Sequence, residues 1–222
     1  MTILQFQQLY FITQSKELDF DKSVKMVGAV TGMTPDQVDQ LPMAKFNKLC
    51  AKIQKHLDVL GQNMMKGKPR KLVMVKGRLY QIHYRVDKLP INAGRYVETI
   101  TFGKDVIANL HKIMASISTP VNWRGKPYER DHADVAADFE SMNFEAAYHA
   151  AVFFYTHYRV SMQLIQPYLI RELVSKGADR DQATAILNSS LTILDGFTMP
   201  NWSQNLKGYL LNRFGGSELS SS

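Results

Sequence analysis

One short β-rich segment interrupts a chain whose apolar residues otherwise recur with helical spacing. The segment runs from Leu72 to Val86 and places two runs of β-favouring residues on either side of Lys76-Gly77. Glycine accepts the positive φ of a two-residue turn, so we expect an antiparallel hairpin over about residues 71–86. The sequence therefore predicts a mainly α fold, a helical bundle with one small β-hairpin.

The second strand of this hairpin alternates apolar and polar residues. Successive side chains of a strand point to opposite faces, so one face of this strand is expected to be buried. The residues that share that face are Tyr80, Ile82, Tyr84 and Val86.

Helical signals fill the first 60 residues. We expect a helix over Ile3–Ser15, and a second one carrying Val24, Val27 and Val30. Asp19 or Asp21 would cap the second helix and Gly32 would end it. Thr34 would cap a short turn through Leu41, and Pro42 would start a helix that carries Cys50 as a small core residue.

The second half of the chain is expected to be helical again. Tyr96–Phe102 and Lys104–Ser116 are expected to be two helices or one helix broken at Gly103. Further helices are expected over Asp131 or Asp134 to Met142, Asn143–Leu164, Tyr168–Ser175 and Asp179–Leu194. Pro120–Pro127 is expected to be a loop. Pro167 is expected to kink or divide the long helix, because proline lacks the N–H that a helix interior uses.

These signals divide the chain into four predicted parts. They are an N-terminal helical module (1–60), a basic linker and hairpin (61–90), a C-terminal helical bundle (91–215) and a flexible tail (216–222). The most apolar stretch, Ala146–Tyr158, is shorter than the roughly 20 residues of a bilayer span, so we expect no membrane-spanning segment.

The net charge of +7 is concentrated in one segment. Between Leu60 and Val86 there are seven basic residues and no acidic ones, whereas the rest of the chain carries 20 of each sign. The residues that could contact an anionic partner are Lys66, Lys68, Arg70, Lys71, Lys76, Arg78 and Arg85. Beside Tyr80 and Tyr84 they fit nucleic acid, an acidic protein, or a solvated strand edge.

The sequence contains no recognisable catalytic motif. Asp131, His132 and Asp134, with Asp138 one turn further on, could bind a divalent ion, but acids at a helix start are also favoured by the helix dipole. We therefore predict no catalytic residue, metal or cofactor, and a protein that is not an enzyme.

A cluster of aromatic residues marks the expected long helix. These residues would form a packing or oligomer face, and they are Phe144, Tyr148, Phe153, Phe154, Tyr155 and Tyr158. His149 and His157 lie among them and are expected to be buried histidines that find a hydrogen-bond partner.

Two stretches resemble proteins of tailed phages. Thr31–Pro42 resembles the TG-x-(S/T)-x-(E/D)-x-V-x-x-(L/M)-P segment of small helical tail-assembly proteins. Lys76–Tyr80, the region Leu89–Tyr96, and Phe153-Phe154 together resemble proteins of phages that infect Bacteroidetes, including crAss-like phages.

The resemblance implies a structural or cargo component of the particle, associated with the portal or tail, in the virion and in the host cytoplasm during assembly. Its partners would be other phage structural proteins and further copies of itself. Two alternatives stay open: a tail-assembly chaperone that is absent from the mature virion, and a nucleic-acid-binding module that contacts DNA through the basic hairpin.

Overall fold

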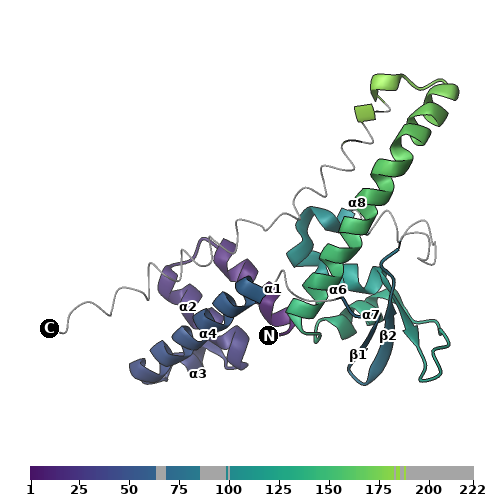
Figure 1. Ribbon diagram of the computed structural model, residues 1–222. Helices are drawn as coiled ribbons and strands as arrows, with labels where there is room; N and C mark the ends of the chain where they lie inside the picture. The colour runs from purple at the N-terminus through teal and green to yellow at the C-terminus, as the bar shows by residue number, and fades with distance from the viewer. Residues whose placement is uncertain (64–68, 86–98, 100, 183, 186–187, 189–222) are drawn as a thin grey trace. The chain divides into compact units, whose positions relative to one another are not determined.

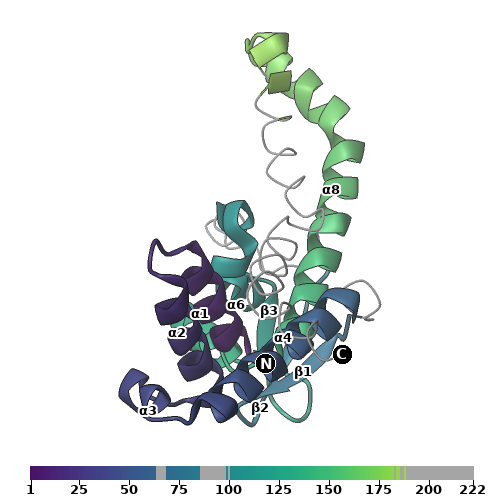
Figure 2. The same cartoon turned by 90° about the vertical axis from the view of Figure 1, so that its left-hand side faces the viewer.

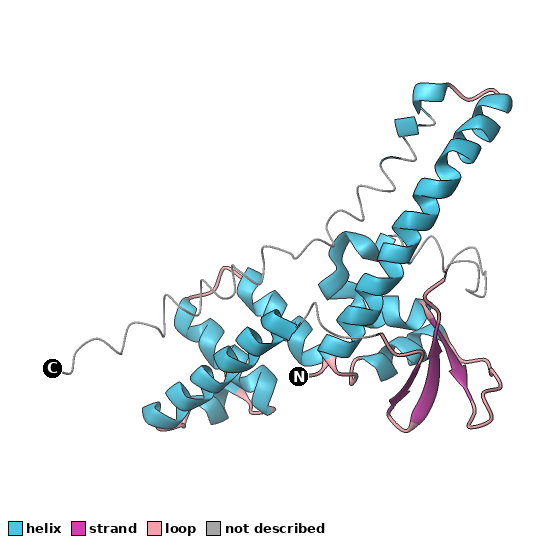
Figure 3. Cartoon of the chain, viewed as in Figure 1, coloured by secondary structure: helices cyan, strands magenta, loops and turns pink. Residues whose placement is uncertain are grey.

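A computed structural model describes residues 1–63, 69–85, 99, 101–182, 184–185 and 188 (Figure 1). The chain divides into two compact units, which are described separately. Among the described residues, the first unit contains 1–63 and 143–145, and the second contains the others. Helices dominate and the strands form one small sheet, which confirms the predicted mainly α class with a β-hairpin (Figure 3).

The first unit is built from α1 (Ile3–Gln14), α2 (Asp19–Thr31), α3 (Pro35–Asp39) and α4 (Met43–Asn63). Threonine caps start two of these helices, because Thr2 accepts a hydrogen bond from the backbone N–H of Gln5, and Thr34 accepts one from that of Gln37. In both cases the glutamine side chain reaches back to the N–H of its cap, so two otherwise unsatisfied donors are paired at each helix start.

The predicted cap of α2 is wrong. Neither Asp19 nor Asp21 caps this helix, since Leu18 occupies the cap position without a side-chain hydrogen bond. Both aspartates lie in the first helical turn, where the helix dipole favours negative charge. The predicted end at Gly32 is confirmed, with φ of 77°.

Apolar side chains from α2, α3 and α4 form the core of the first unit. The buried members of this cluster are Val24, Val27, Val38, Phe46, Cys50 and Ile53. Burial raises the pKa of the Cys50 thiol to about 11, so this thiol stays protonated at neutral pH. In the same unit the ring of Phe6 stacks on that of Phe144, with centroids 3.6 Å apart.

The chain approaches α2 closely at Gly28. A Cβ added at this position would lie 2.9 Å from the backbone oxygen of Met33, which is closer than real Cβ atoms come. The turn after α2 folds back against the helix here, so glycine is required for space.

We predict that Gly28→Ala destabilises the protein. Alanine improves helix propensity by about 1 kcal/mol, but the contact with the Met33 carbonyl costs about 1–3 kcal/mol because the backbone must shift. Urea unfolding followed by circular dichroism measures the balance. A midpoint equal to or above that of the wild type would contradict the close approach.

The second unit contains an antiparallel sheet of order β1-β2-β3, formed by Leu72–Val75, Arg78–Ile82 and Ser118–Val121. The first two strands are the predicted hairpin. Its turn residues Lys76 and Gly77 have φ of 47° and 73°, the positive values that suit a two-residue turn between twisted strands. The predicted inner face is buried at Tyr80, Ile82 and Tyr84, whereas Val86 lies outside the described residues.

The third strand corrects the predicted loop at Pro120–Pro127. β3 pairs with β2 in the register Tyr80 to Pro120, so the loop begins only after Val121. Pro120 is tolerated because its backbone polar groups point away from β2, where its carbonyl accepts from the N–H of Tyr128, so the missing N–H removes no bond between β2 and β3. The chain then turns through Gly125, which has φ of 75°, while Asn122 Oδ1 accepts from the N–H groups of Arg124 and Lys126.

Helices cover the inner face of this sheet. The chain passes through the 3-10 turn η2 (Gly103–Asp105) and α6 (Val106–Ser116), and later through α7 (His132–Phe139). The ring of Tyr80 packs on that of Phe139 in α7, with centroids 4.9 Å apart. The predicted start of α7 is confirmed, since Asp131 Oδ1 accepts from the N–H of Ala133.

The long helix α8 (Phe144–Ser175) runs through Pro167 without a break, so the predicted division there is wrong. Pro167 is exposed, and water can satisfy the carbonyl that the missing N–H leaves free. Up to Tyr158 one face of α8 is buried. Among the described side chains of α8 beyond Tyr158, none is buried, and this part extends past the sheet, α6 and α7 in two views (Figures 1 and 2).

The two histidines of α8 agree with their prediction only in part. His149 is buried, but its Nε2 has no hydrogen-bond partner among the described residues. His157 is exposed, and its ring stands edge-on to that of Phe153 at 4.4 Å.

Candidate functional site

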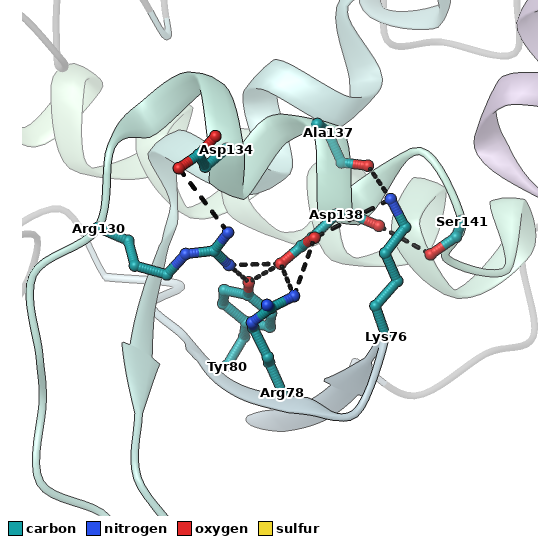
Figure 4. Close-up of polar contacts among 8 residues, drawn as sticks. All are labelled: Lys76, Arg78, Tyr80, Arg130, Asp134, Ala137, Asp138 and Ser141. Atoms are coloured by element: carbon teal, nitrogen blue, oxygen red, sulfur yellow. Dashed lines mark hydrogen bonds and ion pairs between the residues drawn. The ribbon is translucent and has the colours of Figure 1, made fainter.

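A densely connected polar site in the described part of the second unit centres on one buried carboxylate, that of Asp138 in α7. The Asp138 side chain is 7% exposed, and cations from the hairpin and from the segment before α7 surround it (Figure 4). We call the residues Lys76, Arg78, Tyr80, Arg130, Asp134 and Asp138 the Asp138 cluster.

The carboxylate of Asp138 accepts hydrogen bonds from three side chains. Tyr80 Oη donates to Asp138 Oδ2 at 2.6 Å, and Arg130 Nη1 donates to the same oxygen. Arg130 Nη1 also donates to Tyr80 Oη at 2.7 Å. Arg78 Nη1 lies 3.2 Å from Oδ2 and 3.4 Å from Oδ1. Both oxygens of this carboxylate therefore lie near a donor.

Lys76 at the hairpin turn completes the cluster. Its Nζ lies 3.9 Å from Asp138 Oδ1 and donates to the backbone oxygen of Ala137 at 2.9 Å. On the other side, Arg130 Nη2 lies 4.0 Å from Asp134 Oδ2. The cluster thus ties the hairpin turn, β2 and the start of α7 together.

The protonation states follow from these contacts. Burial by itself would raise the pKa of Asp138, but hydrogen bonds from Tyr80 and Arg130 and the nearby guanidinium charges outweigh it and hold that pKa below its usual range. Burial and the adjacent carboxylate raise the pKa of Tyr80 well above its usual value. Asp138 is therefore ionised and Tyr80 protonated at neutral pH, and the lowered pKa makes the carboxylate a weak base.

The cluster uses two of the basic residues predicted to meet an anionic partner. Lys76 and Arg78 are paired with Asp138, and together with Arg130 they face two carboxylates, which leaves an excess of one positive charge. Arg70, Lys71 and Arg85 are exposed, whereas Lys66 and Lys68 lie outside the described residues. Of the five described cations, two are therefore engaged with Asp138 and three are exposed.

The residues considered as possible metal ligands also make separate contacts. Asp131 caps α7, Asp138 faces its cations, and His132 Nε2 lies 3.0 Å from Ser116 Oγ. Among the described residues no group of three or more histidine, cysteine, aspartate or glutamate side chains is arranged to hold a metal ion.

A hollow of about 470 Å³ lies between α6 and α7. Its lining residues are Phe102, His111, Lys112, His132, Ala133, Ala136, Ala137 and Glu140. The hydroxyl of Ser116 is buried behind this hollow and donates to the carbonyl of Lys112, so it is not presented to a substrate as a nucleophile.

The predicted aromatic face of α8 forms part of the protein core. Five of its six residues are buried, and only Phe153 is exposed. Tyr155 is held further by its hydroxyl, which donates to the backbone oxygen of Thr99 at 2.6 Å. This face therefore packs within the chain.

Comparison with known proteins adds no assignment. No protein-family model matches the chain, and no curated protein or solved structure shows significant similarity to it. The phage resemblance of the two sequence stretches stays a prediction.

No helix in the described part of the chain has the length and apolar character needed to cross a bilayer.

We predict that Asp138→Asn lowers the free energy of unfolding by about 2–3 kcal/mol, because a buried amide cannot accept from Tyr80, Arg78 and Arg130 together. Asp134→Asn is the matched control. Its side chain is 68% exposed, so the change should stay within about 0.5 kcal/mol. Equal effects of the two variants in urea unfolding would contradict the central role of Asp138.

We predict that His111 makes stability fall in mild acid. Burial holds the pKa of His111 below its usual 6.5, helped by Lys112 and His132 and opposed by Glu140. Below pH 6.5 the unfolded chain therefore binds a proton that the folded chain does not. The free energy of unfolding thus falls as the pH is lowered, until His111 is protonated in the folded chain as well.

The variant His111→Gln measures this effect. Urea unfolding between pH 7 and pH 5 should show a weaker pH dependence in the variant, by at most one proton, with His83 and His56 supplying a remaining slope because burial lowers their pKa too. The same slope in both proteins would show that His111 does not couple stability to pH.

Proposed function

We propose that this protein is a non-enzymatic structural or cargo component of a tailed-phage particle, which acts by holding other protein chains. The observation that carries the proposal is the second half of α8, residues 159–175, which we call the α8 arm. The arm exposes large apolar side chains along its whole length, and they are Val160, Leu164, Ile165, Tyr168, Leu173 and Val174.

Exposed apolar surface on this scale marks a contact site. Single exposed apolar residues are common, but contiguous patches on soluble chains usually bind a protein or a membrane. The arm carries six such side chains within 15 residues, and it extends beyond the sheet, α6 and α7 (Figure 2). A partner protein that covers the arm would remove this surface from water.

The sites of the second unit agree with a role in binding rather than catalysis. The Asp138 cluster is fully occupied by internal hydrogen bonds and ion pairs. The serine beside the α6–α7 hollow is buried. The phage assignment itself is supported by the resemblance of Thr31–Pro42 and of the stretches that begin at Lys76.

The nucleic-acid alternative has less support. Two of the five described hairpin cations, Lys76 and Arg78, already pair with Asp138, and that pairing would have to be given up or shared with a phosphate. The tail-assembly chaperone fits the exposed arm equally well, so the experiment below separates it from the virion component.

We predict that quantitative mass spectrometry finds the chain in gradient-purified particles at a fixed number of copies. The matched sample is the lysate of the same infected cells. Presence in the lysate only, bound to a tail protein, would replace the virion component by the assembly chaperone. Absence from the particles and from any complex with a tail protein would show that the proposed function is wrong.

A further inference from the structure

The α8 arm has two opposite faces, and the chain itself occupies one of them. Gln166, Leu169 and Ile170 are half-buried, and Gln166 Nε2 donates to Asn188 Oδ1 at 2.8 Å. Residues 180–182, 184–185 and 188 are helical after a cap at Asp179, so the chain returns along this side of the arm.

The other face is exposed and apolar. Val160, Leu164 and Tyr168 follow at intervals of four residues, which places them in one row along the helix, about 120–160° around the axis from Gln166. These three residues are 50%, 76% and 67% exposed, in that order. We call this row the α8 stripe.

The α8 stripe carries no charge. From Val160 to Ile170 the sequence contains no acidic or basic residue, although the chain as a whole carries +7. A strongly charged partner would find nothing on this row to pair with. A second copy of the chain, by contrast, would meet no like charge here, despite the positive charge that both copies carry elsewhere.

The spacing and size of the α8 stripe residues are self-complementary. Leu164 lies midway between Val160 and Tyr168, so two antiparallel arms related by a two-fold axis at Leu164 would bring Val160 of each copy opposite Tyr168 of the other. The small side chain then faces the large one, and Leu164 meets its own copy. A two-fold interface requires this reciprocity, in which residue i contacts j and j contacts i.

We propose that the α8 stripe is a homodimerisation surface, in which the arms of two copies pack antiparallel about Leu164. For its biological role this pairing rests on the proposed function, but the oligomeric state is measured on the purified chain without any particle. A monomeric chain that is found in particles would therefore overturn the pairing alone.

The first test is sedimentation equilibrium of the full chain across a wide range of concentrations. The wild type is expected to show a reversible monomer–dimer equilibrium. Leu164→Glu would place two carboxylates against each other on the axis and should weaken dimerisation more than about a hundredfold. Because Leu164 is mostly exposed in the monomer, the variant keeps its fold, which circular dichroism verifies.

The matched control is Gln163→Glu. Gln163 is exposed and lies one residue before Leu164, about 100° around the helix, so the same charge is added beside the α8 stripe instead of on it. This variant should dimerise like the wild type. A wild type that is monomeric at all concentrations, or equal weakening by the two variants, would overturn the proposal.

Disulfide trapping tests the direction of the pair. Cys50 is buried with a raised pKa and should not interfere. Under mild oxidation Leu164→Cys should link to its own copy, and a mixture of Val160→Cys with Tyr168→Cys should give the mixed disulfide. Efficient linking of Val160→Cys to itself, without the mixed product, would show a parallel pair and contradict the two-fold axis at Leu164.

Discussion

The buried carboxylate of Asp138 is the constraint on which the second unit depends. An ionised group that is withdrawn from water is tolerated only when donors and cations replace the lost hydration. The hairpin supplies donors and cations through Tyr80, Arg78 and Lys76, and the segment before α7 supplies the guanidinium of Arg130. These contacts hold the hairpin against α7, and β3 joins the same arrangement because Tyr80 pairs with Pro120.

The helix α8 combines two different environments in one continuous element. Its first half supplies small and aromatic side chains to the core, among them Ala147, Ala151 and Phe154, and Tyr155 is tied to the backbone of Thr99. Its second half also carries many apolar residues, yet the described side chains there stay in contact with water. Both halves keep the helical conformation, the second despite the N–H that Pro167 lacks, so the difference lies in what packs against each half.

Local signals predicted much of this fold, whereas contacts between distant residues could not be predicted. Patterns of a few residues predicted the helix cap at Thr34, the end of α2 at Gly32 and the hairpin turn at Gly77. They also predicted the buried face of β2 from Tyr80 to Tyr84. β3 was missed because four residues with a proline form a strand only when β2 is beside them. Arg70, Lys71 and Arg85 are exposed as basic hairpin residues should be, but no pattern links Arg78 to an acid 60 residues away. One signal was available, since Asp138 lies on the apolar face of α7 beside Val135 and Phe139, where an acid requires a cation.

The hairpin turn also has a consequence for the order in which the second unit folds. Lys76 and Gly77 allow β1 and β2 to pair through contacts between near neighbours in the chain, which in isolated hairpins form within about 1–10 μs. Asp138 reaches the same strand only after a loop of about 60 residues has closed, and that entropy must be lost before the contact is gained. We therefore expect Arg78 and Tyr80 to remain hydrated through the early stages of folding. The removal of water from the carboxylate then becomes a late step, which locks a sheet whose first two strands are already paired.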